Sequence, residues 1–110
     1  VVICGAETPG EVRMKAQVVD IPGLPTPFIE NDELVAVITS AATVDEAYKM
    51  AVDEMHGFLT GIVGMTVNDA AMLMSLVGSL KFCQVVDPLL TVRFEFPTSV
   101  LADYGFVMPR

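Results

Sequence analysis

Residues 71–92, AMLMSLVGSLKFCQVVDPLLTV, constrain the fold of this chain more than any other stretch. The segment has the composition of a membrane span, yet polar residues interrupt it every few positions and an Asp-Pro pair ends it. Its helical part, expected over residues 66–80, is shorter than the about 20 residues that cross a bilayer. We therefore expect a central helix packed on a sheet, on a neighbouring domain or on a second subunit.

Charge and hydropathy limit the partners of the chain. Six basic against fourteen acidic residues among 110 give a net charge of −8, which argues against nucleic acid and anionic membrane surfaces. The apolar fraction of 53% is high for a small domain with much surface. We therefore expect the chain to bury apolar faces against other protein. Cys4 and Cys83 fit no C-x-x-C or zinc spacing, so two reduced thiols in a cytoplasmic protein are expected, with a disulfide or a reactive thiol as alternatives.

Periodicity predicts an α+β fold with a mostly antiparallel sheet and an inserted helix pair. The expected strands cover residues 1–4, 11–20, 28–30, 33–41 and 90–97, and residues 81–88 are expected to form either a strand or a crossing from helix to strand. A capping box formed by Thr43 and Glu46 begins a helix that we expect to end near residues 59–63, and Thr66 begins a second helix. The chain thus divides into strands and loops (1–42), the helix pair (43–81), and terminal strands with a surface tail (82–110).

Three residues are candidates for chemistry. Glu7 lies in a Gly- and Pro-bounded loop after an apolar run, a common place for a catalytic carboxylate, although an exposed loop acid is the alternative. Gln84 has apolar neighbours, so its amide is expected to bind either a backbone group or a substrate. His56 is expected on a solvated helix face, where Val52 and Thr60 occupy the positions of a second metal ligand. These residues alone do not name an activity.

Two segments resemble the acetamidase/formamidase family. DEAYKMAVDEMHGFL and TVNDAAMLMSLVGSLKFCQVVDPLLTVRFEFPTSVL are similar to its C-terminal portion, which shows a D-E-A helix, an E-A-Y-x-L-L-S-L helix and Q-V-V-(D/N)-P. VVICGAETPGEVRMK resembles a family strand. The family's upstream histidine and acid motifs do not occur in this sequence, and Ser79 stands where the family often has an acid. The matching residues are Asp45, Glu46, Ala47, Ala51, Met55, Ala71, Leu73, Ser75, Leu76, Gln84, Val85, Val86, Asp87 and Pro88.

The resemblance implies the C-terminal part of a larger β-rich amidase that hydrolyses formamide or acetamide to carboxylate and ammonia. It implies the N-terminal part of the same amidase as a partner, and we also expect a homo-oligomer. Family chemistry would polarise the carbonyl with oxyanion donors or a divalent metal, zinc or calcium, whose ligands lie outside this chain. In this chain it implies Glu7 as a catalytic carboxylate and, second, Gln84 as a substrate-binding residue. The alternative function is a non-enzymatic assembly domain that uses the apolar helix over residues 66–80.

Overall fold

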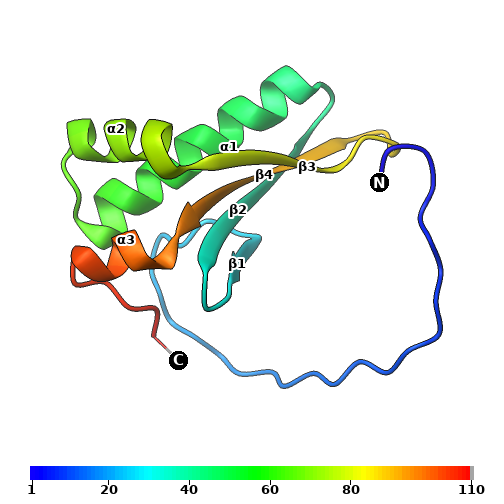
Figure 1. The fold of residues 1–110 in the computed structure, drawn as a ribbon, viewed down its shortest axis with the longest axis horizontal. Coiled ribbons are helices and arrows are strands. Elements are labelled where there is room, and N and C mark those ends of the chain that lie inside the picture. The colour runs from blue at the N-terminus through cyan, green and yellow to red at the C-terminus, as the bar shows by residue number, and fades with distance from the viewer. Residues whose placement is uncertain (110) are drawn as a thin grey trace.

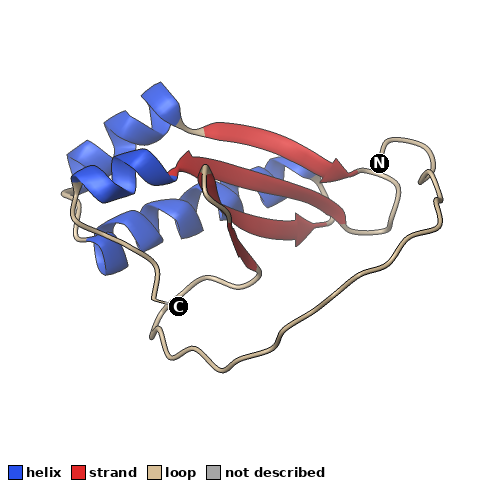
Figure 2. Ribbon diagram, turned by 60° about the horizontal axis from the view of Figure 1, so that its bottom comes forward, coloured by secondary structure: helices blue, strands red, loops and turns tan. Residues whose placement is uncertain are grey.

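The computed structural model describes residues 1–109 and places one four-stranded antiparallel sheet against a layer of helices (Figures 1 and 2). The strands are β1 (Phe28–Glu30), β2 (Leu34–Ala41), β3 (Ser79–Gln84) and β4 (Leu90–Pro97). They lie in the spatial order β1-β2-β4-β3. Strand β4, the last strand along the chain, is therefore a central strand of the sheet. This arrangement confirms the predicted α+β class with a mostly antiparallel sheet and an inserted helix pair.

The central strands β2 and β4 bury one face of the sheet because their apolar residues alternate. Val35 lies opposite Phe96, and Val37 lies opposite Phe94. All four side chains are buried in the core. Directly opposed side chains share one face of a sheet, so these pairs form the floor on which the helices pack.

Helix α1 (Val44–Phe58) begins at the predicted capping box. Thr43 Oγ1 accepts from the Glu46 backbone N at 3.2 Å, and the Glu46 carboxylate accepts from the Thr43 backbone N at 3.2 Å. A cap of this kind stabilises a helix by about 1 kcal/mol. Thr39 Oγ1 on β2 donates to the Ala47 carbonyl at 2.6 Å, which pairs a buried hydroxyl inside the sheet–helix contact. The residues of α1 that are buried in the core are Ala47, Ala51, Met55 and Phe58.

A π-helical segment and a glycine connect α1 to the second helix of the predicted pair. A π-helical segment, η1 (Leu59–Val63), ends at Gly64, whose φ of 86° lies in the left-handed region that glycine adopts without steric cost. Helix α2 (Val67–Val77) begins at Thr66, as predicted, and Thr66 Oγ1 accepts from the Asp69 backbone N at 3.1 Å. The helix ends earlier than expected, because β3 begins only two residues after it.

Helix α2 is buried on one side only. Ala70 and Met74 are buried against the rest of the chain, whereas Leu76 is 79% exposed and Met72 is 56% exposed. Of the three predicted alternatives, the structure shows packing on the sheet of the same chain. The expected central position is wrong for residues 1–109, because the other apolar side of α2 has no cover from them. No helix in this range combines the length and the apolar character needed to cross a bilayer.

Three predicted features of the two ends are wrong. Residues 11–20 form no strand, and side chains that alternation assigned to a buried face, such as Met14 (91% exposed) and Val18 (99% exposed), face solvent. Alternation cannot hold a strand that has no neighbour to pair with. Residues 1–4 also form no strand. In place of a surface tail, α3 (Thr98–Asp103) follows β4 and buries Leu101 in the core.

Candidate functional site

The polar side chains of β3 and β4 gather on the face of the sheet that points away from α1. On β4, Thr91, Arg93 and Glu95 alternate with the core residues of that strand. Ser40 lies opposite Thr91, and Lys81 lies opposite Arg93, so both belong to the same face. We call this set of five residues, together with Gln84, the polar face.

An ion cluster occupies the middle of the polar face. Arg93 Nε donates to Glu95 Oε1 at 2.6 Å, and Lys81 Nζ lies 3.1 Å from Glu95 Oε2. The Glu95 side chain is only 9% exposed. Burial raises the pKa of Glu95, but the hydrogen bonds from Arg93 and Lys81 outweigh burial and hold that pKa below its ordinary value. Glu95 is therefore an ionised carboxylate with both oxygens engaged, which suits an anchoring role better than proton transfer.

Gln84 organises the turn between β3 and β4. Its Nε2 donates to the Leu89 carbonyl at 2.6 Å and to Thr91 Oγ1 at 2.9 Å. Its Oε1 accepts from the backbone N of Val86 and of Asp87, each at 2.9 Å. Both donors and both lone pairs of the amide are thus in use within the turn. The Gln84 side chain makes the backbone contacts that the sequence left open as one of two alternatives, and a substrate would have to displace one of them.

Glu7 lies in an exposed segment without helix or strand. Within residues 1–109, no hydrogen bond or ion pair joins Glu7 to another group, and the structure does not bring it into contact with Gln84. The two predicted site residues therefore remain separate in this chain. Cys4 is exposed and Cys83 is half-buried, and neither forms a disulfide.

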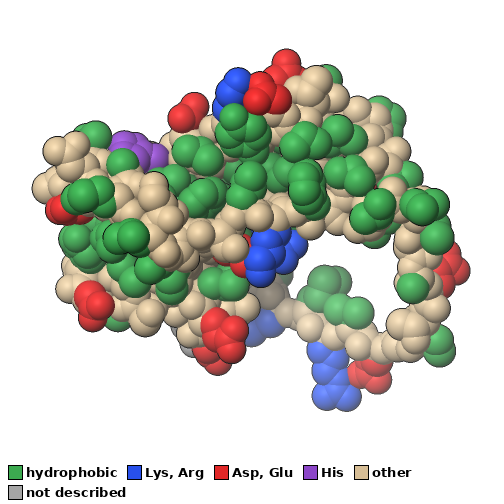
Figure 3. All heavy atoms as spheres, turned by 45° about the horizontal axis from the view of Figure 1, so that its top comes forward, with side chains coloured by type: hydrophobic (Ala, Val, Ile, Leu, Met, Phe, Trp, Pro, Cys, Tyr) green, Lys and Arg blue, Asp and Glu red, His purple; other side chains and the backbone are tan. Residues whose placement is uncertain are grey.

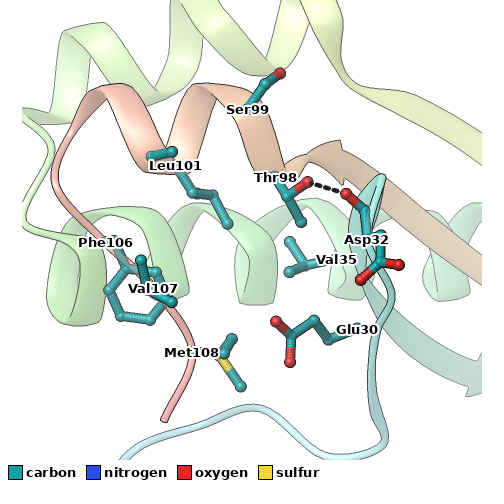
Figure 4. A pocket seen from close by; sticks show the side chains of 10 residues that line it. Glu30, Asp32, Val35, Thr98, Ser99, Leu101, Phe106, Val107 and Met108 are labelled. Atoms are coloured by element: carbon teal, nitrogen blue, oxygen red, sulfur yellow. Dashed lines mark hydrogen bonds between the residues drawn. The ribbon is translucent and has the colours of Figure 1, made fainter. Parts of the chain in front are cut away.

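A cavity of about 310 Å³ lies at the other end of the sheet, between β1, α3 and the C-terminal segment (Figure 4). The Glu30 side chain points into it between Val35 and Met108. Thr98 Oγ1 donates to the Asp32 carbonyl at 2.9 Å and ties the start of α3 to the β1–β2 turn. This cavity was not predicted from the sequence, because α3, which forms one of its walls, was not predicted.

The described residues offer no metal centre of their own. Within residues 1–109, no three histidine, cysteine or acidic side chains lie close enough together to hold a metal ion. His56 Nε2 lies 3.2 Å from the Val67 carbonyl and links α1 to the start of α2. Residues 1–109 therefore do not fit a metal site.

Comparison with solved structures gives the family context of this geometry. The chain is similar to an acetamidase from Bacillus halodurans, with 32% identity and a TM-score of 0.72 over 76% of this chain and 28% of that one. A predicted acetamidase/formamidase from the thermophile Thermoanaerobacter tengcongensis matches with 33% identity and a TM-score of 0.69, over 74% of this chain and 27% of that one.

An acetamidase from Yersinia enterocolitica matches with 30% identity and a TM-score of 0.64, over 67% of this chain and 22% of that one. The chain therefore spans about a quarter of the length of these structures. No family model matches the chain, and no curated protein sequence does so significantly. The structural matches confirm the family resemblance that the helix pair and the Gln84–Pro88 motif indicated.

Proposed function

We propose that this chain, which resembles acetamidase/formamidase structures in sequence and fold, is the C-terminal part of an amidase that hydrolyses small linear amides. The products would be a carboxylate and ammonia, and formamide and acetamide are the proposed substrates. The observation that carries this proposal is the joint likeness in fold and sequence to three proteins named as amidases, at 30–33% identity. None of the three supports the alternative of a non-enzymatic assembly domain.

The rest of the amidase would supply most of the catalytic machinery. The matched structures are several times longer than their common part with this chain, because it covers only 22–28% of them. Oxyanion donors, or a zinc or calcium ion with its ligands, would come from that remaining part. We use the term complementary part for the remaining, N-terminal part of the same amidase, and in experiments the Bacillus halodurans acetamidase without the segment that this chain matches takes its place. Further copies of the assembled protein are the other proposed partners, and the cytoplasm is the proposed compartment.

Glu7 is the proposed catalytic carboxylate of this chain. Its side chain is exposed and accepts no hydrogen bond within residues 1–109, so both oxygens are free to orient a water molecule or the amide nitrogen of a substrate. Gln84 remains a proposed substrate-binding residue. A substrate amide offers N–H donors and a carbonyl acceptor, as the backbone groups around Gln84 do. A bound substrate would therefore replace one of these backbone groups at the β3–β4 turn.

The test is amide hydrolysis by this chain co-expressed with the complementary part. We expect ammonia release from acetamide or formamide by the complex, and none by this chain alone. In that complex, Glu7→Gln should lower turnover by about 100-fold or more. Asp20→Asn, which neutralises an acid of the same irregular segment, is the matched control and should leave turnover unchanged. Full activity of the Glu7 variant would remove Glu7 from the site, and a stable complex without turnover would favour the assembly domain.

A further inference from the structure

Strand β3 is an edge strand without the usual protection of an edge. Strand β4 pairs with one side of β3, and no strand within residues 1–109 pairs with the other side. Exposed edges are normally protected by proline, charge or a covering element, since they otherwise recruit another strand. The β3 sequence, SLKFCQ, contains no proline and one charged residue. That residue, Lys81, forms an ion pair with Glu95 on the polar face, so its charge does not protect the edge from pairing with another strand.

The backbone groups of Leu80 and Phe82 point away from the sheet. The Ile38 backbone N donates to the Pro27 carbonyl at 3.2 Å, so even-numbered residues of β2 point to β1 and odd-numbered ones point to β4. Alternation along β4 then directs the backbone of Arg93 toward β3, where its opposite residue is Lys81. The flanking residues Leu80 and Phe82 consequently present N–H and C=O groups on the open side. Within residues 1–109, no other backbone group forms a hydrogen bond with them.

One residue already pairs with this open side. The Val1 nitrogen donates to the Cys83 carbonyl at 2.8 Å, and the Val85 backbone N donates to the Val1 carbonyl at 3.0 Å. These two bonds flank Gln84 in the pattern of a parallel bridge. Figure 1 shows the N-terminus beside the end of β3. The edge therefore accepts an extended backbone, and the direction of that backbone is parallel to β3.

An apolar surface continues from this edge onto the helices. Phe82 is 62% exposed and Leu80 is 46% exposed, and both lie on the helix-bearing face because they oppose buried core residues of β4. Leu76, which is 79% exposed, extends the surface at the end of α2. Next to it, a groove of about 360 Å³ runs between His56 on α1 and Met74 on α2. Figure 3 shows apolar side chains gathered beside this histidine.

We infer that the outer edge of β3 is a docking site for an extended strand of the complementary part, which pairs in parallel with Leu80 and Phe82. Main-chain hydrogen bonds would supply the affinity, as in other cases of strand addition. Apolar side chains at alternate positions of the incoming strand would cover Phe82, Leu80 and Leu76, so a strand with apolar residues on one face is the required partner. The identity of this partner rests on the proposed amidase function.

The test is amide hydrogen exchange of this chain, free and in the complex with the complementary part. The Leu80 and Phe82 amides should exchange at least about tenfold more slowly in the complex, because they gain backbone acceptors. The Lys81 amide is the internal control, since it already points to β4. A second measurement compares the affinity of two variants. Phe82→Asp should weaken the complex by about tenfold or more, because it buries an unpaired charge. Val67→Asp replaces an equally exposed apolar residue at the far end of α2 and should have no effect.

Each outcome decides between the inference and its alternatives. Slower exchange at Leu80 and Phe82 without amide hydrolysis would support the docking edge and overturn the proposed function. An active complex in which both amides exchange as in the free chain would overturn the docking edge and leave the function intact. Failure of the two parts to associate, or equal weakening by Phe82→Asp and Val67→Asp, would also overturn the inference.

Discussion

Gly78 joins α2 to β3 at a point where the structure has no space for a side chain. An ideal Cβ at this residue would lie 2.5 Å from Cζ of Phe94, and it would also overlap the Met74 carbonyl oxygen. Favourable carbon–carbon contacts begin at about 3.5 Å. Phe94 is only 7% exposed and is held in the core, so its ring cannot rotate into solvent. Gly78→Ala must therefore displace either the end of α2 or the ring, and overpacking of this kind costs about 1–3 kcal/mol.

Gly57 provides a matched control for this substitution. It lies in α1, and a Cβ there would meet nothing within 4 Å. Gly57→Ala should therefore stabilise the chain by about 0.5–1 kcal/mol through the lower backbone entropy of its unfolded state. Equilibrium urea unfolding, followed by far-ultraviolet circular dichroism, measures both free energies. We expect the two variants to shift the free energy of unfolding in opposite directions. A Gly78→Ala variant as stable as Gly57→Ala would refute the close approach of α2 to β4.

Two further predictions concern the polar face. Glu95 has a lowered pKa when folded, so it contributes stability above its unfolded pKa and loses that contribution as the pH falls through the folded value. Glu95→Gln should cost about 1–3 kcal/mol near neutral pH and flatten the loss of stability in acid, whereas Asp45→Asn, at an exposed ion pair, should leave the acid profile nearly unchanged. An unaltered acid profile for the Glu95 variant would contradict the ion cluster. Gln84→Ala should destabilise the β3–β4 turn by about 1–3 kcal/mol and speed amide exchange at Val86 and Asp87. Unchanged exchange at both amides would exclude the role of Gln84 in the turn.

The elements that the sequence predicts correctly are those whose signals are local. The capping box at Thr43 and Glu46 forms as expected, because its two hydrogen bonds lie within four residues of chain. Strand β4 follows its alternation, since both of its sides find partner strands. Residues 11–20 show a similar alternation and form no strand. The difference is a pairing partner, which a sequence pattern cannot supply.

The candidate site depends on contacts that periodicity does not encode. The alternation of β4 placed Arg93 and Glu95 on one face, but it gave no indication that Lys81 would reach Glu95 from a strand earlier in the chain. For Gln84, the apolar neighbours left open whether its amide binds a backbone group or a substrate. The cavity beside Glu30 was not predicted, because one of its walls is α3. That helix begins directly after Pro97 and has no side-chain cap that would indicate its start in the sequence.

The most direct measurement of the central claim is ammonia release from acetamide and formamide at equal protein concentrations by this chain, by the complementary part and by their mixture. Because this chain covers about a quarter of the matched amidases, we predict activity only in the mixture, at a stoichiometry of one to one. Turnover of either amide by this chain alone, or a well-formed mixture that releases no ammonia, would contradict the account.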